Sequence, residues 1–246
     1  MKDTMYMLPL ILAFVSCVAK AAFDPHPVGI WMMNTDSGGT DTSGTGNDAT
    51  PHDVTLTTGP TGEENTAYRF HGRSTSYLSI ENSSSMDVGA NGSFTFTAFV
   101  KTEKSTAAFL EYVHASQPWC LHIWNWDYNN LYVNLPKRSP FEGQANYFDK
   151  NLPIMENAWH FIGVSYNKEQ QWLLGIVDNK TDIQSFGGWT IESQSTEILL
   201  GKRGGAEASY LLGEMSCAML FSTSLSEVDI HRAKKYCLKN AKPQGT

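Results

Sequence analysis

The residues best suited to metal chemistry lie in a loop at positions 35–48 that is rich in Gly, Ser and Thr. Four of its side chains offer oxygen ligands: Asp36, Asp41, Asn47 and Asp48. Ca²⁺ takes about six to eight oxygens, often from such loops. Glu142 and Asp149 flank a second polar loop, and neither loop has the spacing of an EF-hand. Two interpretations stay open, a calcium site and a solvated connector, and the pattern favours the connector.

Three aromatic residues at alternate positions, Trp124, Trp126 and Tyr128, would share one face of a strand. Such a face can stack on sugar rings or anchor a protein partner. However, Leu121 and Ile123 make the opposite face apolar, and tryptophan is usually buried. A central strand covered on both faces is therefore the favoured interpretation, and a ligand-binding platform is the alternative.

The N-terminal segment 1–21 has the pattern of a secretory signal peptide. Lys2 precedes an apolar stretch from Tyr6 to Val18, and Ala19-Lys20-Ala21 has the small-x-small form that a signal peptidase recognises. The stretch is too short to span a bilayer, which needs about 20 apolar residues. We therefore expect a secreted, extracellular chain with no membrane span, in which residues 22–246 form one domain.

Export changes how the cysteines are interpreted. Cys17 would leave with the signal, so the mature chain keeps Cys120, Cys217 and Cys237, an odd number in an oxidising compartment. This predicts one disulfide and one further thiol, which is either buried or able to bridge a second molecule. Three sequons predict a glycoprotein, at Asn82, Asn91 and Asn179.

Charge excludes one class of partner. The formal net charge is −7, and the sequence contains no basic stripe that could neutralise phosphates. Nucleic acid is therefore not an expected ligand.

Most of the chain predicts short strands separated by turns. Residues 93–102 alternate cleanly, with Phe94, Phe96, Ala98 and Val100 on one side. Further strands are expected in the ranges 67–72, 76–81, 159–167, 172–179 and 196–202. About 12 to 14 antiparallel strands fit, too many for one ordinary open sheet. The prediction is an all-β, two-sheet sandwich with tryptophans 31, 159 and 172 in its core.

Only the C-terminal end predicts a helix. Ser224 with Glu227 forms a capping-box pattern, and Ser226 with Asp229 is a second register. Ile230, Ala233 and Cys237 recur at helical spacing, and Lys234 and Lys235 suit the C-terminal end of the dipole. We expect this short helix to lie across the edge of the sandwich.

Four stretches together resemble one known superfamily. They are VGIWMMNTDSGGTDTSGTGNDAT from residue 28, AYRFHGRSTSYLSIENS from 67, ENAWHFIGVSYN from 156 and LLGEMSCAMLFSTSLSEVDIHRA from 211. In order and spacing they resemble the laminin-G-like and pentraxin branch of the concanavalin-A-like lectin/glucanase superfamily. The resemblance covers roughly residues 28 to 238 and implies a jelly-roll sandwich. It also implies a disulfide between Cys217 and Cys237, while pairing of Cys120 with Cys217 is the alternative.

The same resemblance tests for catalysis. Glycoside hydrolases of that superfamily carry Glu-x-Asp-x-(x)-Glu on one strand, which places the carboxylates on a common face. This sequence has no such spacing and no Gly-x-Ser-x-Gly elbow. His160 lies in the Trp-His strand of the family, where the resemblance implies a structural role. We therefore predict that the chain is not an enzyme.

The resemblance implies an extracellular recognition or matrix protein that binds glycans or matrix proteins, with or without the help of calcium. A purely structural component of an extracellular or mineralised matrix is the alternative. An exported glycoside hydrolase is disfavoured because the carboxylate strand is missing.

Overall fold

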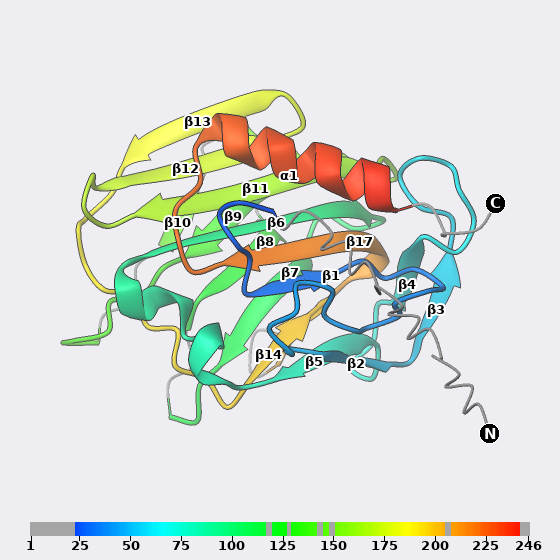
Figure 1. Ribbon diagram of the computed structural model, residues 1–246, viewed down its shortest axis with the longest axis horizontal. Coiled ribbons are helices and arrows are strands. Elements are labelled where there is room, and N and C mark those ends of the chain that lie inside the picture. The colour runs from blue at the N-terminus through cyan, green and yellow to red at the C-terminus, as the bar shows by residue number, and fades with distance from the viewer. Residues whose placement is uncertain are drawn as a thin grey trace, which may run out of the picture.

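The computed structural model describes residues 23–116, 120–126, 129–141, 145–147, 151–204 and 208–241. Their strands form two large sheets and one small hairpin (Figure 1). The eight-stranded sheet contains, in spatial order, β13 (Lys180–Ser185), β12 (Trp172–Val177), β11 (His160–Asn167), β6 (Ser93–Thr102), β17 (Leu212–Phe221), β4 (Ala67–His71) and β3 (Val54–Thr57), with β1 (Gly29–Trp31) also paired to β17. The seven-stranded sheet contains β10 (Ala145–Tyr147), β9 (Asn130–Asn134), β8 (His122–Trp126), β7 (Ala107–Val113), β14 (Glu197–Leu200), β5 (Tyr77–Glu81) and β2 (Ala49–His52).

The remaining elements are small. β15 (Lys202–Arg203) and β16 (Ser209–Tyr210) pair with each other, and two short 3₁₀ helices, η1 (Ser84–Met86) and η2 (Val88–Asn91), precede β6. All described strand pairs are antiparallel. The predicted all-β sandwich is therefore confirmed. The described residues contain 17 strands, more than predicted, because strands of two to four residues are too short to show an alternating pattern.

Strand β6 shows how the core is built. Phe94, Phe96, Ala98 and Val100 alternate into the interior between the sheets, as predicted. The opposite side of β6 is also buried, because Phe99 belongs to a second apolar cluster outside the eight-stranded sheet. This sheet is therefore covered on both faces in its centre rather than exposed to water on one side.

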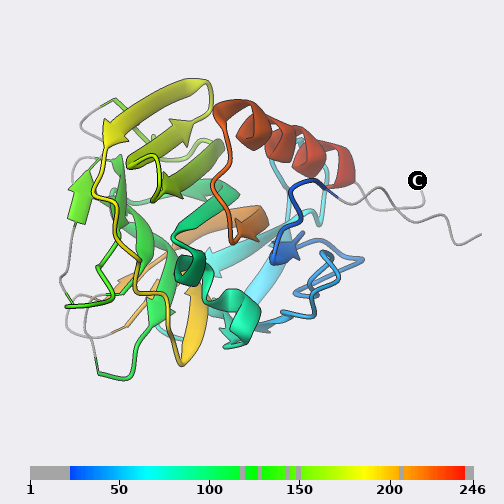
Figure 2. The same ribbon diagram turned by 60° about the vertical axis from the view of Figure 1, so that its left-hand side comes forward.

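Helix α1 (Glu227–Asn240) provides that cover. Its buried face, Ile230, Ala233 and Cys237, contacts the outer side of the eight-stranded sheet, and Figure 2 shows the helix outside the strands. The prediction that the helix lies across the sandwich edge is therefore wrong. The outer face of the sheet offers a larger apolar area for the helix to bury than an edge would.

The N-terminus of α1 uses the second of the two predicted registers. Ser226 is the N-cap, and its hydroxyl accepts a hydrogen bond from the Asp229 N–H at 3.2 Å. The helix continues to Asn240, so Lys239 rather than Lys234 or Lys235 lies in its last turn.

A disulfide joins Cys217 of β17 to Cys237 of α1, which confirms the expected pairing. The alternative bridge between Cys120 and Cys217 is wrong. Cys120 is a free thiol with 1% of its surface exposed, and it lies 3.3 Å from the Glu192 carbonyl oxygen. The sequence left two possibilities for this thiol, burial or a bridge to a second molecule, and the structure shows that it is buried. The folded chain therefore does not present this thiol for a bridge to a partner.

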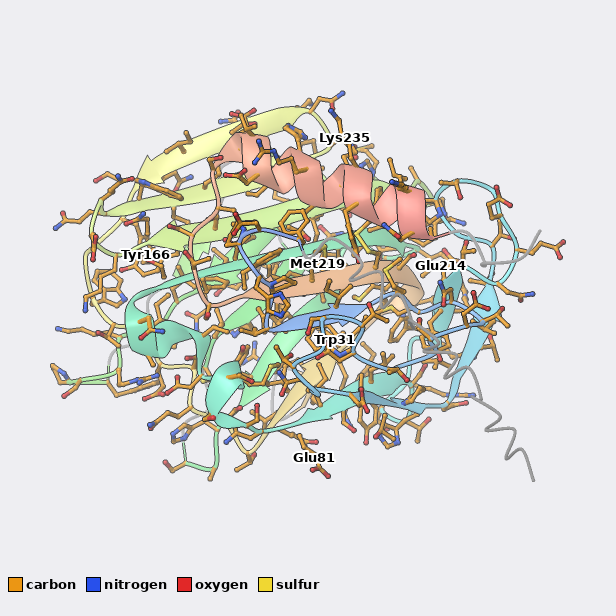
Figure 3. All side chains as sticks on the ribbon, viewed as in Figure 1. Trp31, Glu81, Tyr166, Glu214, Met219 and Lys235 are labelled. Atoms are coloured by element: carbon orange, nitrogen blue, oxygen red, sulfur yellow. A yellow bond between two sulfur atoms is a disulfide. The ribbon has the colours of Figure 1, made fainter. Side chains whose placement is uncertain are left out.

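The three tryptophans expected in the core differ from one another. Trp31, labelled in Figure 3, is fully buried, and its indole N–H donates a hydrogen bond to the Asn47 carbonyl oxygen at 2.8 Å. Trp159 and Trp172 are only partly buried and pack beside the cluster under α1. The core assignment of these two is wrong, because Trp159 precedes β11 and Trp172 is only the first residue of β12. Among the described residues, no helix is long and apolar enough to cross a bilayer.

Candidate functional site

The 35–48 loop is organised around the carboxylate of Asp41. This group accepts five hydrogen bonds, from the N–H groups of Ile30, Ser43 and Asn47 and from the hydroxyls of Ser43 and Thr45. Burial opposes ionisation of Asp41, but these hydrogen bonds outweigh it and hold the pKa below its ordinary value. The carboxylate is thus already satisfied by donors of the chain.

The other proposed calcium ligands also have structural contacts. The Asn47 amide donates to the Val28 carbonyl at 2.6 Å and accepts from the Ser83 hydroxyl at 2.7 Å, and Asp48 accepts from the Asp41 N–H at 2.8 Å. Asp36 is exposed. Within the described residues, no three or more His, Cys, Asp or Glu side chains cluster as a metal site. Calcium at this loop stays a prediction, and Glu142 and Asp149 lie outside the described residues.

The tryptophans of β8 share one face, as their spacing predicts. Trp124 and Trp126 lie on the outer side of the seven-stranded sheet with ring centroids 5.3 Å apart, while Tyr128 lies outside the described residues. Trp124 is only 2% exposed, because it stacks on His122 at 4.8 Å and the Arg203 guanidinium lies 4.3 Å from its ring centre. Leu121 and Ile123 occupy the core on the other side. β8 is therefore covered on both faces, the interpretation that the sequence favoured.

A buried polar cluster completes this region: Glu111, His122, Trp124 and Arg203. Glu111 lies 3.8 Å from Arg203 and 3.8 Å from His122. Burial raises the pKa of Glu111 to about 8, although Arg203 and the Trp124 N–H oppose the shift. Burial, helped by the nearby Arg203 charge, lowers the pKa of His122 to about 3. The hairpin residue Arg203 is itself buried, so these groups hold β15 against the sheet rather than facing a ligand.

His160 has the structural role that the resemblance implies. Its Nε2 accepts a hydrogen bond from the Met155 N–H at 3.1 Å, and its Nδ1 lies 2.7 Å from the Asp178 carboxylate. Since Nε2 accepts, Nδ1 carries the proton and donates to Asp178. The ring therefore ties the start of β11 to the β12–β13 turn.

An open pocket lies at one end of the sandwich. Its volume is about 410 Å³, and three segments distant in the sequence line it: Lys137, Arg138 and Ser139 after β9, Lys168 in the β11–β12 turn, and Gly188, Trp189 and Thr190 between β13 and β14. The β11–β12 turn is at the left in Figure 1, and Tyr166, labelled in Figure 3, lies at the same end.

Trp189 is fixed within the pocket wall. A Cβ on Gly187 would lie 1.7 Å from the Trp189 ring, so the ring packs directly on that glycine. The Trp189 indole N–H donates to the Leu135 carbonyl at 3.3 Å, and the Phe186 ring centre lies 4.7 Å from the indole ring centre. The Tyr166 hydroxyl lies 2.7 Å from the Gly187 carbonyl oxygen and 2.8 Å from that of Trp189, and its single proton is shared between these two acceptors. A partly exposed indole is thus held in one orientation.

Sequence reasoning missed this pocket. The Gly187-Gly188-Trp189 run was a usable signal, because adjacent glycines let an aromatic ring fold back on the chain. Nothing in the sequence shows, however, that Lys168 and Arg138 lie beside that ring. The predicted glycan acceptors Asn82, Asn91 and Asn179 are all exposed.

No protein-family model and no curated protein matches the chain. Solved structures do match. The binding domain of Paraclostridial Mosquitocidal Protein 1 matches with a TM-score of 0.66 at 13% identity, over 86% of this chain and 52% of that one. The ligand-binding domain of Botulinum neurotoxin serotype D in complex with N-acetylneuraminic acid matches with a TM-score of 0.64 at 14% identity, over 86% and 51%.

The binding domain of Botulinum neurotoxin DC in complex with rat synaptotagmin II matches with a TM-score of 0.62 at 13% identity, over 88% and 52%. This chain therefore spans about half the length of the structures it matches. They are binding domains rather than catalytic domains. At such identities the likeness establishes the fold alone, and this chain has the β-sandwich fold of the matched part of these binding domains.

Proposed function

We propose that this protein is an exported, non-catalytic recognition protein that binds a glycan in the pocket beside Trp189. The observation that carries the proposal is a fixed, partly exposed indole in the wall of an open pocket of about 410 Å³. The apolar face of an aromatic ring stacks on the C–H face of a sugar, while neighbouring polar groups bond its hydroxyls.

The structural neighbours support this proposal. One is in complex with N-acetylneuraminic acid and another with rat synaptotagmin II. A further structure, which matches with a TM-score of 0.62 at 13% identity, is described by the statement that cell entry of botulinum neurotoxin type C is dependent upon interaction with two ganglioside molecules. Those ligands belong to domains of which this chain matches about half. The laminin-G-like assignment is part of the same proposal, supported by the order of the sequence motifs along the sandwich.

The absence of catalysis is also part of the proposal. Glu111 and His122 form an acid–base pair 3.8 Å apart on the outer face of the seven-stranded sheet, and both are buried beside Arg203. Chemistry on a polysaccharide would need these groups to reach the substrate. Turnover of any polysaccharide by the purified protein would contradict this part.

Export rests on the signal-like segment 1–21 and agrees with the Cys217–Cys237 disulfide. Expression of the full chain in a eukaryotic cell should release it into the medium, with an N-terminus at residue 22. Treatment with a glycan-removing amidase should lower its mass if the exposed sequons carry glycans. Retention of the uncleaved chain inside the cell would contradict export.

A glycan array tests the binding proposal. The wild-type protein should bind a subset of glycans, and Trp189→Ala should lose that binding. Trp159→Ala is the matched control, because it removes another partly buried indole far from the pocket-lining residues. Each protein is run with calcium and with EDTA, so that the array also tests the calcium prediction. Absence of binding by folded wild-type protein under both conditions would refute glycan recognition.

A further inference from the structure

The pocket is basic although the chain as a whole is acidic. Among the described residues that line it, three of seven are Lys137, Arg138 and Lys168, and none of these seven is Asp or Glu. The formal net charge of the chain is −7. The pocket is therefore locally positive on a chain whose net charge is negative. Such a local positive charge attracts a ligand that is negatively charged.

Arg138 is already balanced. Its guanidinium pairs with the Asp87 carboxylate, its Nε lies 3.6 Å from Glu192, and it also bonds the Ser193 hydroxyl at 3.4 Å. These contacts connect the segment after β9 to Asp87, between η1 and η2, and to the connection between β13 and β14. The positive charge of Arg138 is therefore already paired with carboxylates, and its main role is to stabilise the wall of the pocket.

Lys168 is placed differently. Its Nζ donates to the Thr190 hydroxyl at 2.9 Å, a neutral partner, and Thr190 also lines the pocket. An ammonium group has three donors, so this bond leaves capacity for a ligand. Within the described ranges, the hydrogen bond that engages this ammonium goes to a hydroxyl and not to a carboxylate.

The side chain of Lys168 is also held in place. A Cβ on Gly92 would lie 2.4 Å from Cδ of Lys168, so the aliphatic stem packs on that glycine, and the Lys168 N–H donates to the Gly92 carbonyl at 3.0 Å. Because the stem is packed and the amine is bonded, little side-chain freedom remains to be lost when a ligand binds. The positive charge is thus presented in a fixed position beside the Trp189 indole.

We propose that this pocket selects an acidic sugar, one that carries a carboxylate or a sulfate, and that the Lys168 ammonium recognises this anionic group while Trp189 stacks on the ring. This inference rests on the proposed glycan-binding function and adds the charge of the ligand. An unbalanced cation at a pocket rim favours an anion over a neutral hydroxyl through a charge-assisted hydrogen bond.

Two pairs of probes that differ only in charge test the proposal by calorimetric titration. The carboxylate pair is oligogalacturonate and its methyl ester, and the sulfate pair is dextran sulfate and dextran. Wild-type protein should bind the charged member of at least one pair about tenfold more tightly than its neutral partner. The pair that shows the difference identifies the anion, and raising the salt concentration should weaken that binding.

Lys168→Gln should abolish the difference within the pair, because it removes the positive charge and leaves a polar side chain only one atom shorter. Lys235→Gln is the matched control; it removes the same charge from the exposed side of α1, where Figure 3 labels it. Circular dichroism and a thermal melt check that both variants are folded.

The outcomes separate the two proposals. Equal binding of charged and neutral probes would overturn the acidic-sugar inference and leave glycan binding intact. A charge preference that survives in Lys168→Gln would overturn the role of Lys168. Failure of the wild type to bind these probes and every glycan on the array would overturn both proposals together.

Discussion

Ile230 of α1 packs directly on the backbone of Gly163 in β11: a Cβ added at Gly163 would lie 2.8 Å from Cγ2 of Ile230. The absence of a side chain at this position lets the helix approach the outer face of the sheet. A disulfide and an apolar cluster then hold it there.

Gly163→Ala should therefore destabilise the chain by about 1–3 kcal/mol, because the new methyl group pushes the helix away from the sheet. Urea unfolding followed by circular dichroism measures this free energy. In an Ile230→Ala background the same glycine substitution should cost clearly less, since the opposing methyl group is gone. Equal costs in both backgrounds would show that the contact with Ile230 is not the cause.

The Cys217–Cys237 disulfide closes a separation of 20 residues. Replacing both cysteines by serine should lower the free energy of unfolding by about 3 kcal/mol, because the unfolded chain regains the freedom that the bridge removes. Chemical denaturation of the oxidised wild type and the double variant provides the comparison. A loss of less than about 0.5 kcal/mol would contradict the expected contribution.

The Cys120 thiol should resist labelling in the native protein and react once the chain is denatured. It is buried, and burial raises its pKa to about 12, so the reactive thiolate is scarce near neutral pH. A chromogenic disulfide reagent counts the thiols before and after addition of denaturant. Rapid reaction of the folded protein would mean that this thiol is accessible after all.

Asp41→Asn should lower the melting temperature and destabilise the chain by about 1–3 kcal/mol, because an amide cannot accept all five hydrogen bonds. Glu64→Gln, at an exposed position, is the control and should change little. Since the pKa of Asp41 is lowered in the folded chain, its stabilising effect should be present above pH 3.8 and be lost as the pH falls further. Melting curves across this pH range test the stabilising effect of the Asp41 hydrogen bonds. The same curves, recorded with calcium and with EDTA, test whether calcium binds to the loop.

Glu111 should make the protein less stable as the pH rises. Its pKa moves from an ordinary 4.5 to about 8 on folding, so the folded state holds the proton that the unfolded state releases in this interval. His122 opposes this effect below pH 6.5, because its pKa falls from 6.5 to about 3 on folding. The free energy of unfolding should therefore fall with rising pH mainly between 6.5 and about 8, by at most about 1.4 kcal/mol per unit. Glu111→Gln should flatten this slope, whereas Glu81→Gln, at an exposed position, should retain it. Parallel slopes for wild type and Glu111→Gln would contradict the assignment.

Local patterns predicted the elements of the fold well. The alternation in β6 and the Ile230, Ala233, Cys237 spacing in α1 depend only on the geometry of one strand or one helix, so the chain encodes them directly. The family resemblance correctly supplied the cysteine pairing. The number of strands was underestimated because two-residue elements such as β15 carry no periodicity.

The candidate site depended on contacts between distant segments. The sequence favoured a core position for Trp124 and left an exposed platform as the alternative. Arg203, far along the chain, covers its ring. Trp189, Lys168 and Arg138 come from three separate connections and meet only when the strands that carry them are in register.

The sequence by itself determined the all-β character, the amphipathic C-terminal helix and the types of residue available for binding, because these follow from short-range periodicity and composition. The tertiary structure alone decided which face the helix covers, that Cys120 and the Glu111 cluster are closed to solvent, and that three cationic side chains surround one pocket with Trp189 in its wall. Those properties depend on packing between strands that are far apart in the chain, and no local pattern specifies such packing.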